Sequence, residues 1–252
     1  MQGVTQLRDV VYIVTGQSSA IQRFNAKTHQ RLADIVVTGL RDPCDIAACK
    51  LTSRLYVAEN CECVWRVSSD GVDIQRWLPK SPSDMIKPHT LSVTSWRLLV
   101  MLKNNRQLRQ FDAARGDELE RVRLPDYMEP LHAVESPTRT FIVSYWTDVK
   151  KCQVCEVSTT GYVLREFSGP LGWPQHIAVD GKGNIFVADS HNGHIRLLDA
   201  QLALRRVIFF DEYQLNYRWP DRLCYMEQSR QLLVGFFHGS VAVFHVPRRY
   251  TA

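Results

Sequence analysis

The stretch LGWPQHIAVDGKGNIFVADSHNGHIRLLD, residues 171–199, contains the pattern that decides the fold. A proline opens a short apolar strand, glycines mark a turn, and the β-branched run IFVAD follows. The proline and its apolar strand occur five times, 42 to 46 residues apart, at Pro43, Pro88, Pro130, Pro174 and Pro220. A fixed period of this length indicates a repeat protein in which each copy is one supersecondary unit.

Each copy predicts four strands. The second strand is a β-branched run, and six such runs are centred on Ile13, Val57, Val100, Val143, Val187 and Val234. Two apolar residues three apart predict the third strand, and a charged segment such as LERVRL predicts the fourth, where charge discourages edge-to-edge pairing. Four-stranded sheets repeated radially form a propeller. We therefore predict an all-β fold, a six-bladed β-propeller of four-stranded antiparallel blades, as a single domain with blades at approximately 1–39, 40–80, 81–125, 126–169, 170–213 and 214–252.

The two ends of the chain are one strand short of six full copies. The first inner strand falls within Met1–Thr5, whereas the last outer strand would begin beyond Ala252. Either the sixth blade has three strands, or Met1–Leu7 crosses over to complete it. We expect Met1–Leu7 to be extended and hydrogen-bonded at the junction of the first and last blades, because such pairing removes exposed edges.

Composition limits the possible classes of protein. The 252 residues are 45% hydrophobic and 23% charged, which suits a globular domain with a large core and excludes wholesale disorder. The net charge of +5 permits an acidic partner without requiring one. Seven cysteines cannot all pair internally, and we find no secretory leader, glycosylation sequon or membrane-length apolar run. These features predict a cytoplasmic or otherwise intracellular protein without membrane contact.

The fifth copy resembles the NHL repeat. The matching residues are Pro174, Ile177, Ala178, Val179, Asp180, Gly183, Val187, Ala188, Asp189, Asn192, Ile195 and Asp199. The second copy is a weaker match, with Glu59 in place of the aspartate and Cys63 near the polar position of the loop. The resemblance implies a propeller similar to the C-terminal domains of tripartite-motif ubiquitin ligases. It implies no ligase activity, because the zinc-spaced Cys/His pairs of a RING are absent from the sequence.

A first candidate site is formed by the second residue after each proline. These residues should surround the mouth of the central channel, and they are Asp45, Thr90, His132, His176 and Arg222. The resemblance to an NHL-like lyase that holds zinc with histidines at such positions makes His132 and His176 candidate metal ligands, with Asp45 or His89 as a third. The alternative is that these side chains only bond water and neighbouring loops. We expect no cofactor, with zinc as the alternative.

A second candidate site is the loop face, where basic and aromatic residues alternate. Its predicted ligand-binding residues are Arg41, Lys87, Lys103, Arg106, Trp146, Lys150, Trp173, Arg218, Trp219 and Arg222. Such a face suits a protein or peptide, since Trp and Arg dominate protein interfaces, and it also suits single-stranded RNA. Alternatively, the tryptophans pack between blades. We predict a non-enzymatic interaction scaffold that binds a protein, peptide or RNA, the alternative being a metal-dependent lyase or hydrolase at the histidines.

Overall fold

The computed structural model describes residues 1–60, 62–79, 86–102, 105–149, 151–210 and 219–247. These residues form 23 β-strands, and no helix among them could span a membrane. The strands make six antiparallel sheets, five of four strands and one of three, each with its strands in chain order. The predicted fold class, an all-β six-bladed β-propeller, is confirmed. The chain divides into two compact units, 1–122 and 123–252.

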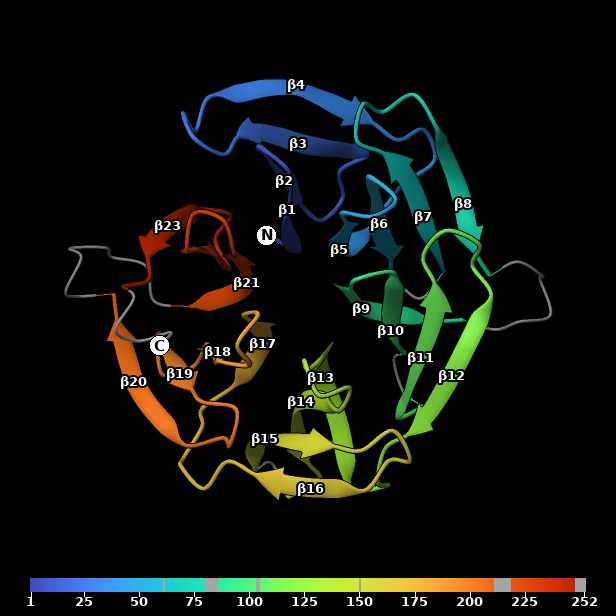
Figure 1. Ribbon diagram of the computed structural model, residues 1–252. Helices are drawn as coiled ribbons and strands as arrows, with labels where there is room; N and C mark the ends of the chain where they lie inside the picture. The colour runs from blue at the N-terminus through green and yellow to red at the C-terminus, as the bar shows by residue number, and fades with distance from the viewer. Residues whose placement is uncertain (61, 80–85, 103–104, 150, 211–218, 248–252) are drawn as a thin grey trace. The chain divides into compact units, whose positions relative to one another are not determined.

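The first unit contains three four-stranded sheets, each a meander (Figure 1). Its strands are β1 (Gly3–Leu7), β2 (Val10–Val14), β3 (Ala20–Asn25), β4 (Arg31–Val36), β5 (Pro43–Cys49), β6 (Arg54–Glu59), β7 (Cys63–Ser68), β8 (Ile74–Leu78), β9 (Pro88–Thr94), β10 (Arg97–Leu102), β11 (Gln107–Asp112) and β12 (Glu118–Arg123). The first strands of adjacent sheets contact each other, β5 lying against both β1 and β9. Tyr56, Trp77 and Phe111 form part of the apolar core between two of these sheets.

The second unit repeats this arrangement with two four-stranded sheets and one of three strands. Its strands are β13 (Met128–Glu135), β14 (Phe141–Thr147), β15 (Cys152–Val157), β16 (Val163–Glu166), β17 (Pro174–Val179), β18 (Ile185–Asp189), β19 (His194–Leu198), β20 (Leu204–Phe209), β21 (Pro220–Met226), β22 (Gln231–Phe236) and β23 (Val241–His245). Strand β17 lies against both β13 and β21. Ala178, predicted to occupy a crowded inner position, packs in one core cluster with Phe186 and Leu223.

The ends of the chain follow the first of the two alternatives. Strand β1 pairs with β2 from Gly3–Val14 to Leu7–Val10, so it is the first strand of the first sheet. The last sheet has three strands in the described part of the chain. The alternative in which Met1–Leu7 completes the last sheet is therefore wrong, because the segment is already used as the inner strand of its own sheet.

A bulge follows the repeat proline in every sheet from the second to the sixth. In β5, for example, Pro43 pairs with Glu59 and Asp45 with Ala58, so Cys44 has no opposite residue. The same shift follows the prolines of β9, β13, β17 and β21. Proline cannot donate to the ladder, and a bulge at that point re-aims the next side chains. The second residue after each proline therefore occupies an equivalent place in five sheets.

Candidate functional site

The five residues that follow this bulge are all buried, none being more than a tenth exposed. They are Asp45, Thr90, His132, His176 and Arg222. The sequence predicts that they surround the mouth of the central channel, and in the structure all five side chains are buried. Two of them, Asp45 and His132, accept hydrogen bonds that join neighbouring sheets.

Asp45 shows this role in the first unit. One carboxylate oxygen accepts a hydrogen bond from the amide of Ile46 at 2.8 Å. The other accepts from the amide of Leu91 at 2.7 Å, which ties β5 to β9 in the next sheet. A buried carboxylate is stable only when its lone pairs are satisfied in this way.

His132 has the same role in the second unit. Its Nδ1 accepts a hydrogen bond from the amide of Ile177 at 3.3 Å. Ile177 and Leu91 are both the third residue after a repeat proline, so the two bonds are equivalent. Because Nδ1 is the acceptor, the proton of a neutral His132 is on Nε2. The residue two after the proline thus joins neighbouring blades in both units.

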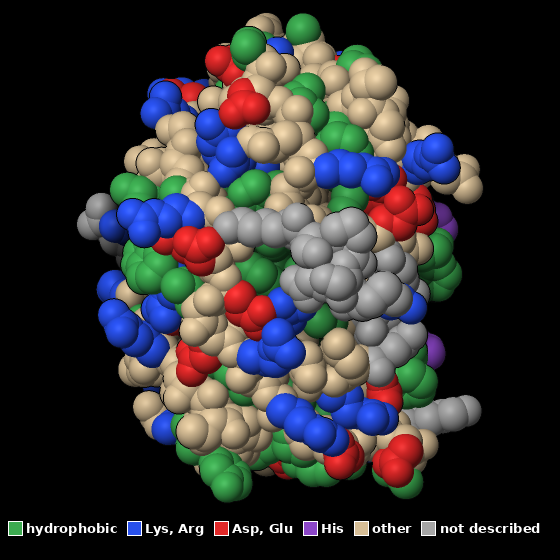
Figure 2. Space-filling view, turned by 90° about the vertical axis from the view of Figure 1, so that its right-hand side faces the viewer, with side chains coloured by type: hydrophobic (Ala, Val, Ile, Leu, Met, Phe, Trp, Pro, Cys, Tyr) green, Lys and Arg blue, Asp and Glu red, His purple; other side chains and the backbone are tan. Residues whose placement is uncertain are grey.

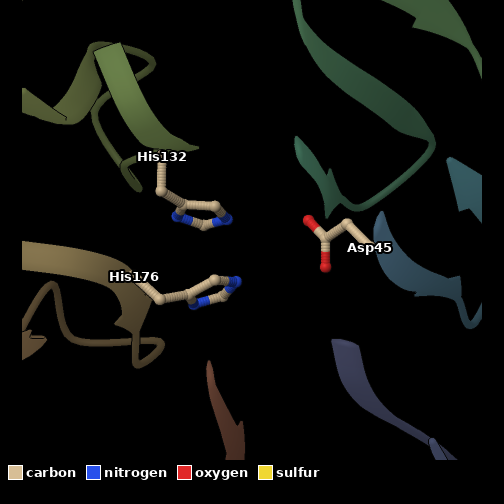
Figure 3. A group of neighbouring side chains, drawn as sticks. All are labelled: Asp45, His132 and His176. Carbon is tan, nitrogen blue, oxygen red and sulfur yellow. The ribbon is translucent and has the colours of Figure 1, made fainter. Parts of the chain in front are cut away.

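The imidazole rings of His132 and His176 lie face to face, with centroids 3.6 Å apart and planes 25° from parallel. Figure 3 shows the two imidazole rings as sticks. Burial lowers the pKa of His176 well below 6.5, and the nearby His132 and the Arg222 guanidinium lower it further. His176 is therefore neutral at pH 7, the form in which imidazole ligates transition metals.

Arg222 is not the exposed cation that its assignment to the binding face requires. It is 5% exposed. Its guanidinium donates to the carbonyl oxygen of Asp221 at 2.8 Å and lies 3.2 Å from the Asp221 carboxylate. A buried, paired arginine contributes to its own strand and does not offer a charge to a ligand in solvent.

Asp189, the aspartate of the NHL-like motif, fixes the loop that precedes β17. One oxygen accepts from the amides of Gly172 and Trp173 at 2.8 and 3.1 Å. The other accepts from Asn192 and Arg196, both at 2.9 Å. Burial alone would raise the pKa of Asp189, but the donors around it outweigh burial and lower the pKa. The backbone of Trp173 is thereby held by a buried, ionised carboxylate.

Backbone hydrogen bonds repeat this restraint in two adjacent blades. The amide of Ser190 donates to the carbonyl oxygen of Trp173 at 2.8 Å, and the amide of Phe237 donates to that of Trp219 at 3.1 Å. In each blade the residue after the second strand is joined to the residue before the repeat proline. Both indoles therefore project from residues whose carbonyl oxygen is hydrogen-bonded to the residue after the second strand.

A pocket of about 290 Å³ opens between these loops. It is lined by Trp173, Ser190, His191, Trp219 and Phe237, which we call the aromatic pocket. Trp173 is 37% exposed, Trp219 44% and Phe237 63%. The alternative that both indoles are buried between blades is therefore wrong. Large aromatic side chains left this exposed on one surface are typical of a binding site.

The aromatic surface continues beyond the pocket at both ends. The ring of Trp146, from β14, lies 5.8 Å from that of Trp173, with the planes inclined by 35°. At the other end His238 lies 5.3 Å from Trp219. The structure thus brings together Trp146, Trp173 and Trp219, the three tryptophans predicted for the loop face.

None of the predicted basic residues that the structure describes lines the aromatic pocket. Arg41 and Lys87 are exposed and Arg106 is half-buried, all three in the first unit. Lys103, Lys150 and Arg218 lie outside the described residues. On the side of the molecule seen in Figure 2, blue Lys and Arg side chains are interspersed with red Asp and Glu.

Sequence reasoning missed Ser190, His191 and His238. All three follow a second strand, at or next to the position whose amide bonds to the residue before the proline. The repeat register contains that signal, because Asp189 pairs with Pro174 and Phe236 pairs with Pro220. The residue after each of these must then face the residue before the proline.

Comparisons with known proteins bear on the fold alone. No family model matches the chain, and no curated protein matches its sequence. Solved structures do match its fold. A gluconolactonase from Xanthomonas campestris is 12% identical with a TM-score of 0.75, over 98% of this chain and 86% of that one. The WD40 β-propeller domain of Doa1 is 14% identical with a TM-score of 0.67, over 99% and 93%.

A third similar structure comes from a complex of nidogen with laminin. It is 13% identical with a TM-score of 0.66, over 83% of this chain and 80% of that one. At these identities the likeness extends to the β-propeller fold, which hosts many unrelated functions. The chain has the β-propeller architecture shared by these proteins.

Proposed function

We propose that this chain is a non-catalytic, NHL-like interaction module whose aromatic pocket binds a peptide segment of a partner protein. The observation that carries the proposal is the pair of indoles, Trp173 and Trp219, both exposed and both fixed through their backbones. Exposed aromatic rings supply most of the binding energy at protein interfaces. Rings that are already held in place lose little conformational entropy when a ligand arrives.

Peptide fits the described surface better than RNA does. Single-stranded RNA needs cations along its backbone as well as stacking rings. In the part of the chain that the structure describes, the residues that line the aromatic pocket include no Lys or Arg. Arg222, the described cation expected beside it, is buried and paired with Asp221. A peptide needs apolar surface and a few polar groups, which the pocket provides with its three large rings, Ser190 and His191.

The proteins of similar fold include both interaction domains and an enzyme, so the fold is compatible with an interaction role but does not distinguish it from catalysis. The comparison structures include a WD40 domain and a nidogen–laminin complex, and also a gluconolactonase. The site must therefore decide the function.

A selection experiment tests the proposal directly. Immobilised protein is used to select binders from a displayed library of random short peptides, and enriched peptides are then measured in solution. We expect Trp219→Ala to weaken them by about tenfold or more, the loss of about 1.4 kcal/mol typical of an interface hot spot. Trp96→Ala is the matched control, because Trp96 is 42% exposed in the first unit and outside the pocket. Peptides that bind both variants as they bind wild type contradict the proposal.

The stacked histidines support a second candidate, metal-dependent catalysis by a lyase or hydrolase. His132 and His176 supply two imidazoles from adjacent strands, and catalytic zinc requires three protein ligands. Elemental analysis of purified protein tests this candidate. Zinc at about one equivalent that is lost in His176→Ala supports a metal site, whereas wild-type protein free of zinc after purification in zinc-containing medium contradicts it.

A further inference from the structure

The described residues that line the aromatic pocket carry no charge unless the one histidine among them is protonated. They are Trp173, Trp219 and Phe237, together with Ser190 and His191. Among these described residues there is no carboxylate to pair with a ligand cation, and no Lys or Arg to pair with a ligand anion. A charged side chain would lose its hydration there without compensation, so the pocket selects a neutral segment.

The three large rings of the pocket, two Trp and one Phe, offer no hydrogen-bond acceptor to a backbone amide. The indole N–H of Trp173 donates to the side chain of Gln175 at 2.5 Å, so the one polar atom of this ring is already bonded within the chain. An ordinary residue laid against these faces would bury an N–H group that needs a partner. Proline has no backbone N–H and therefore avoids that cost.

From these features we infer that the aromatic pocket receives a proline-rich, extended segment of a partner protein, with prolyl rings seated between Trp173 and Trp219. This inference rests on the peptide binding proposed above and names the class of peptide. Proline-rich segments already populate the polyproline II conformation, so little entropy is lost on binding, and aromatic-lined grooves are their usual receptors. Ser190 and His191 are placed at the wall to bond the carbonyl groups that such a segment leaves exposed.

The spacing of the aromatic rings matches an extended ligand. Trp146 lies 5.8 Å from Trp173, and Trp173 lines the pocket together with Trp219, so the aromatic rings come from three consecutive blades. A polyproline II segment advances about 3.1 Å per residue, and the step from Trp173 to Trp146 corresponds to about two residues. A segment longer than the pocket would therefore meet a further aromatic ring.

The test uses the full chain and a fluorescein-labelled decaproline peptide, followed by fluorescence anisotropy. A Gly-Ser peptide of the same length is the ligand control, and Trp96→Ala is the protein control. We expect decaproline to bind wild type and Trp96→Ala equally, and to bind Trp173→Ala and Trp219→Ala about tenfold more weakly. Circular dichroism confirms that each variant is folded before its affinity is compared.

Four results would overturn the inference. Decaproline that fails to bind, or that binds no better than the Gly-Ser peptide, excludes a proline site. Decaproline that binds both pocket variants as it binds wild type places the site elsewhere. If library-selected peptides without proline bind and are lost in Trp219→Ala, the proposed function stands and only the proline inference fails. If a ten-nucleotide oligouridine binds in a Trp219-dependent manner and no peptide does, both proposals fail.

Discussion

Glu59 and Asp189 end the second strand of the second and fifth blades and hold the same loop with different partners. Asp189 accepts from the amides of Gly172 and Trp173, and Glu59 accepts from the amide of Arg41, which is equivalent to Gly172. Where Asp189 faces His194 and Arg196, Glu59 accepts from the Cys63 thiol at 3.2 Å and from the indole N–H of Trp65 at 2.8 Å.

The comparison separates a structural requirement from a functional one. Both blades need a buried carboxylate to hold the loop before the proline, and any set of donors that satisfies it suffices. The exposed side chain on that loop is free to differ, since it is Asp42 in the second blade and Trp173 in the fifth. The carboxylate is therefore required for the fold, whereas the exposed residue on the loop determines the chemistry of the surface.

The largest effect expected is that of Asp189→Ala. Removing this carboxylate leaves Arg196, which is 9% exposed, as a buried cation without its partner. Breaking a buried pair on one side costs about 3–5 kcal/mol. Urea unfolding should show this loss, while Asp148→Ala, an exposed aspartate of the same unit, should change stability by less than about 0.5 kcal/mol. A loss below about 1 kcal/mol would mean that Asp189 does not hold the loop.

Glu59→Ala should cost less, about 1–3 kcal/mol, because its donors are weaker or better solvated. The indole N–H of Trp65 and the thiol of Cys63 lose their acceptor, but Arg76 is more than half exposed and returns to water. The measurement is again urea unfolding. An equal loss of stability in Glu59→Ala and Asp189→Ala would show that the two carboxylate networks stabilise the fold equally, and would contradict this prediction.

Acid should destabilise the folded protein in part through Asp189 of the fifth blade. The pKa of Asp189 is lowered in the folded protein, so its contribution is complete above the unfolded value near 4 and is lost as pH falls below it. One proton changes stability by at most about 1.4 kcal/mol per pH unit. We expect Asp189→Asn to show a flatter loss of stability than wild type between about pH 5 and 2, measured by thermal unfolding. Parallel curves would show that the folded pKa of Asp189 is not lowered.

The smallest effect expected is that of Cys63→Ala, about 0.5–1.5 kcal/mol. Burial and the neighbouring Glu59 together raise the pKa of Cys63 to about 12. The thiol is therefore protonated at neutral pH and donates one of several bonds to Glu59. Alkylation by iodoacetamide should leave Cys63 unmodified in the folded protein, and rapid modification of this residue would show that the carboxylate network opens.

The repeat made the sheets predictable, because the spacing of apolar runs reports strand positions directly. The charged segment LERVRL is the outer strand β12, and VLREF contains β16. The burial of Arg222 was not predictable, since its partner is the adjacent Asp221 and only the bulge after Pro220 turns both inward. The pocket residues Ser190 and His191 were missed because they match no motif. They become neighbours of Trp173 only through the backbone bond from Ser190.

The residue before each repeat proline occupies a position that evolution can change at small cost. Its backbone is restrained by the loop, as the amide of Asn60 bonds to the carbonyl oxygen of Asp42 just as Ser190 bonds to Trp173. Its side chain is exposed in the second, third, fifth and sixth blades and half-buried in the fourth, so in four blades a substitution there alters the surface without disturbing the core. The five positions, one in each of the second to sixth blades, are Asp42, Lys87, Glu129, Trp173 and Trp219. A related chain could acquire a new binding specificity through one or two codon changes at these positions. For the same reason, a new specificity could be engineered there.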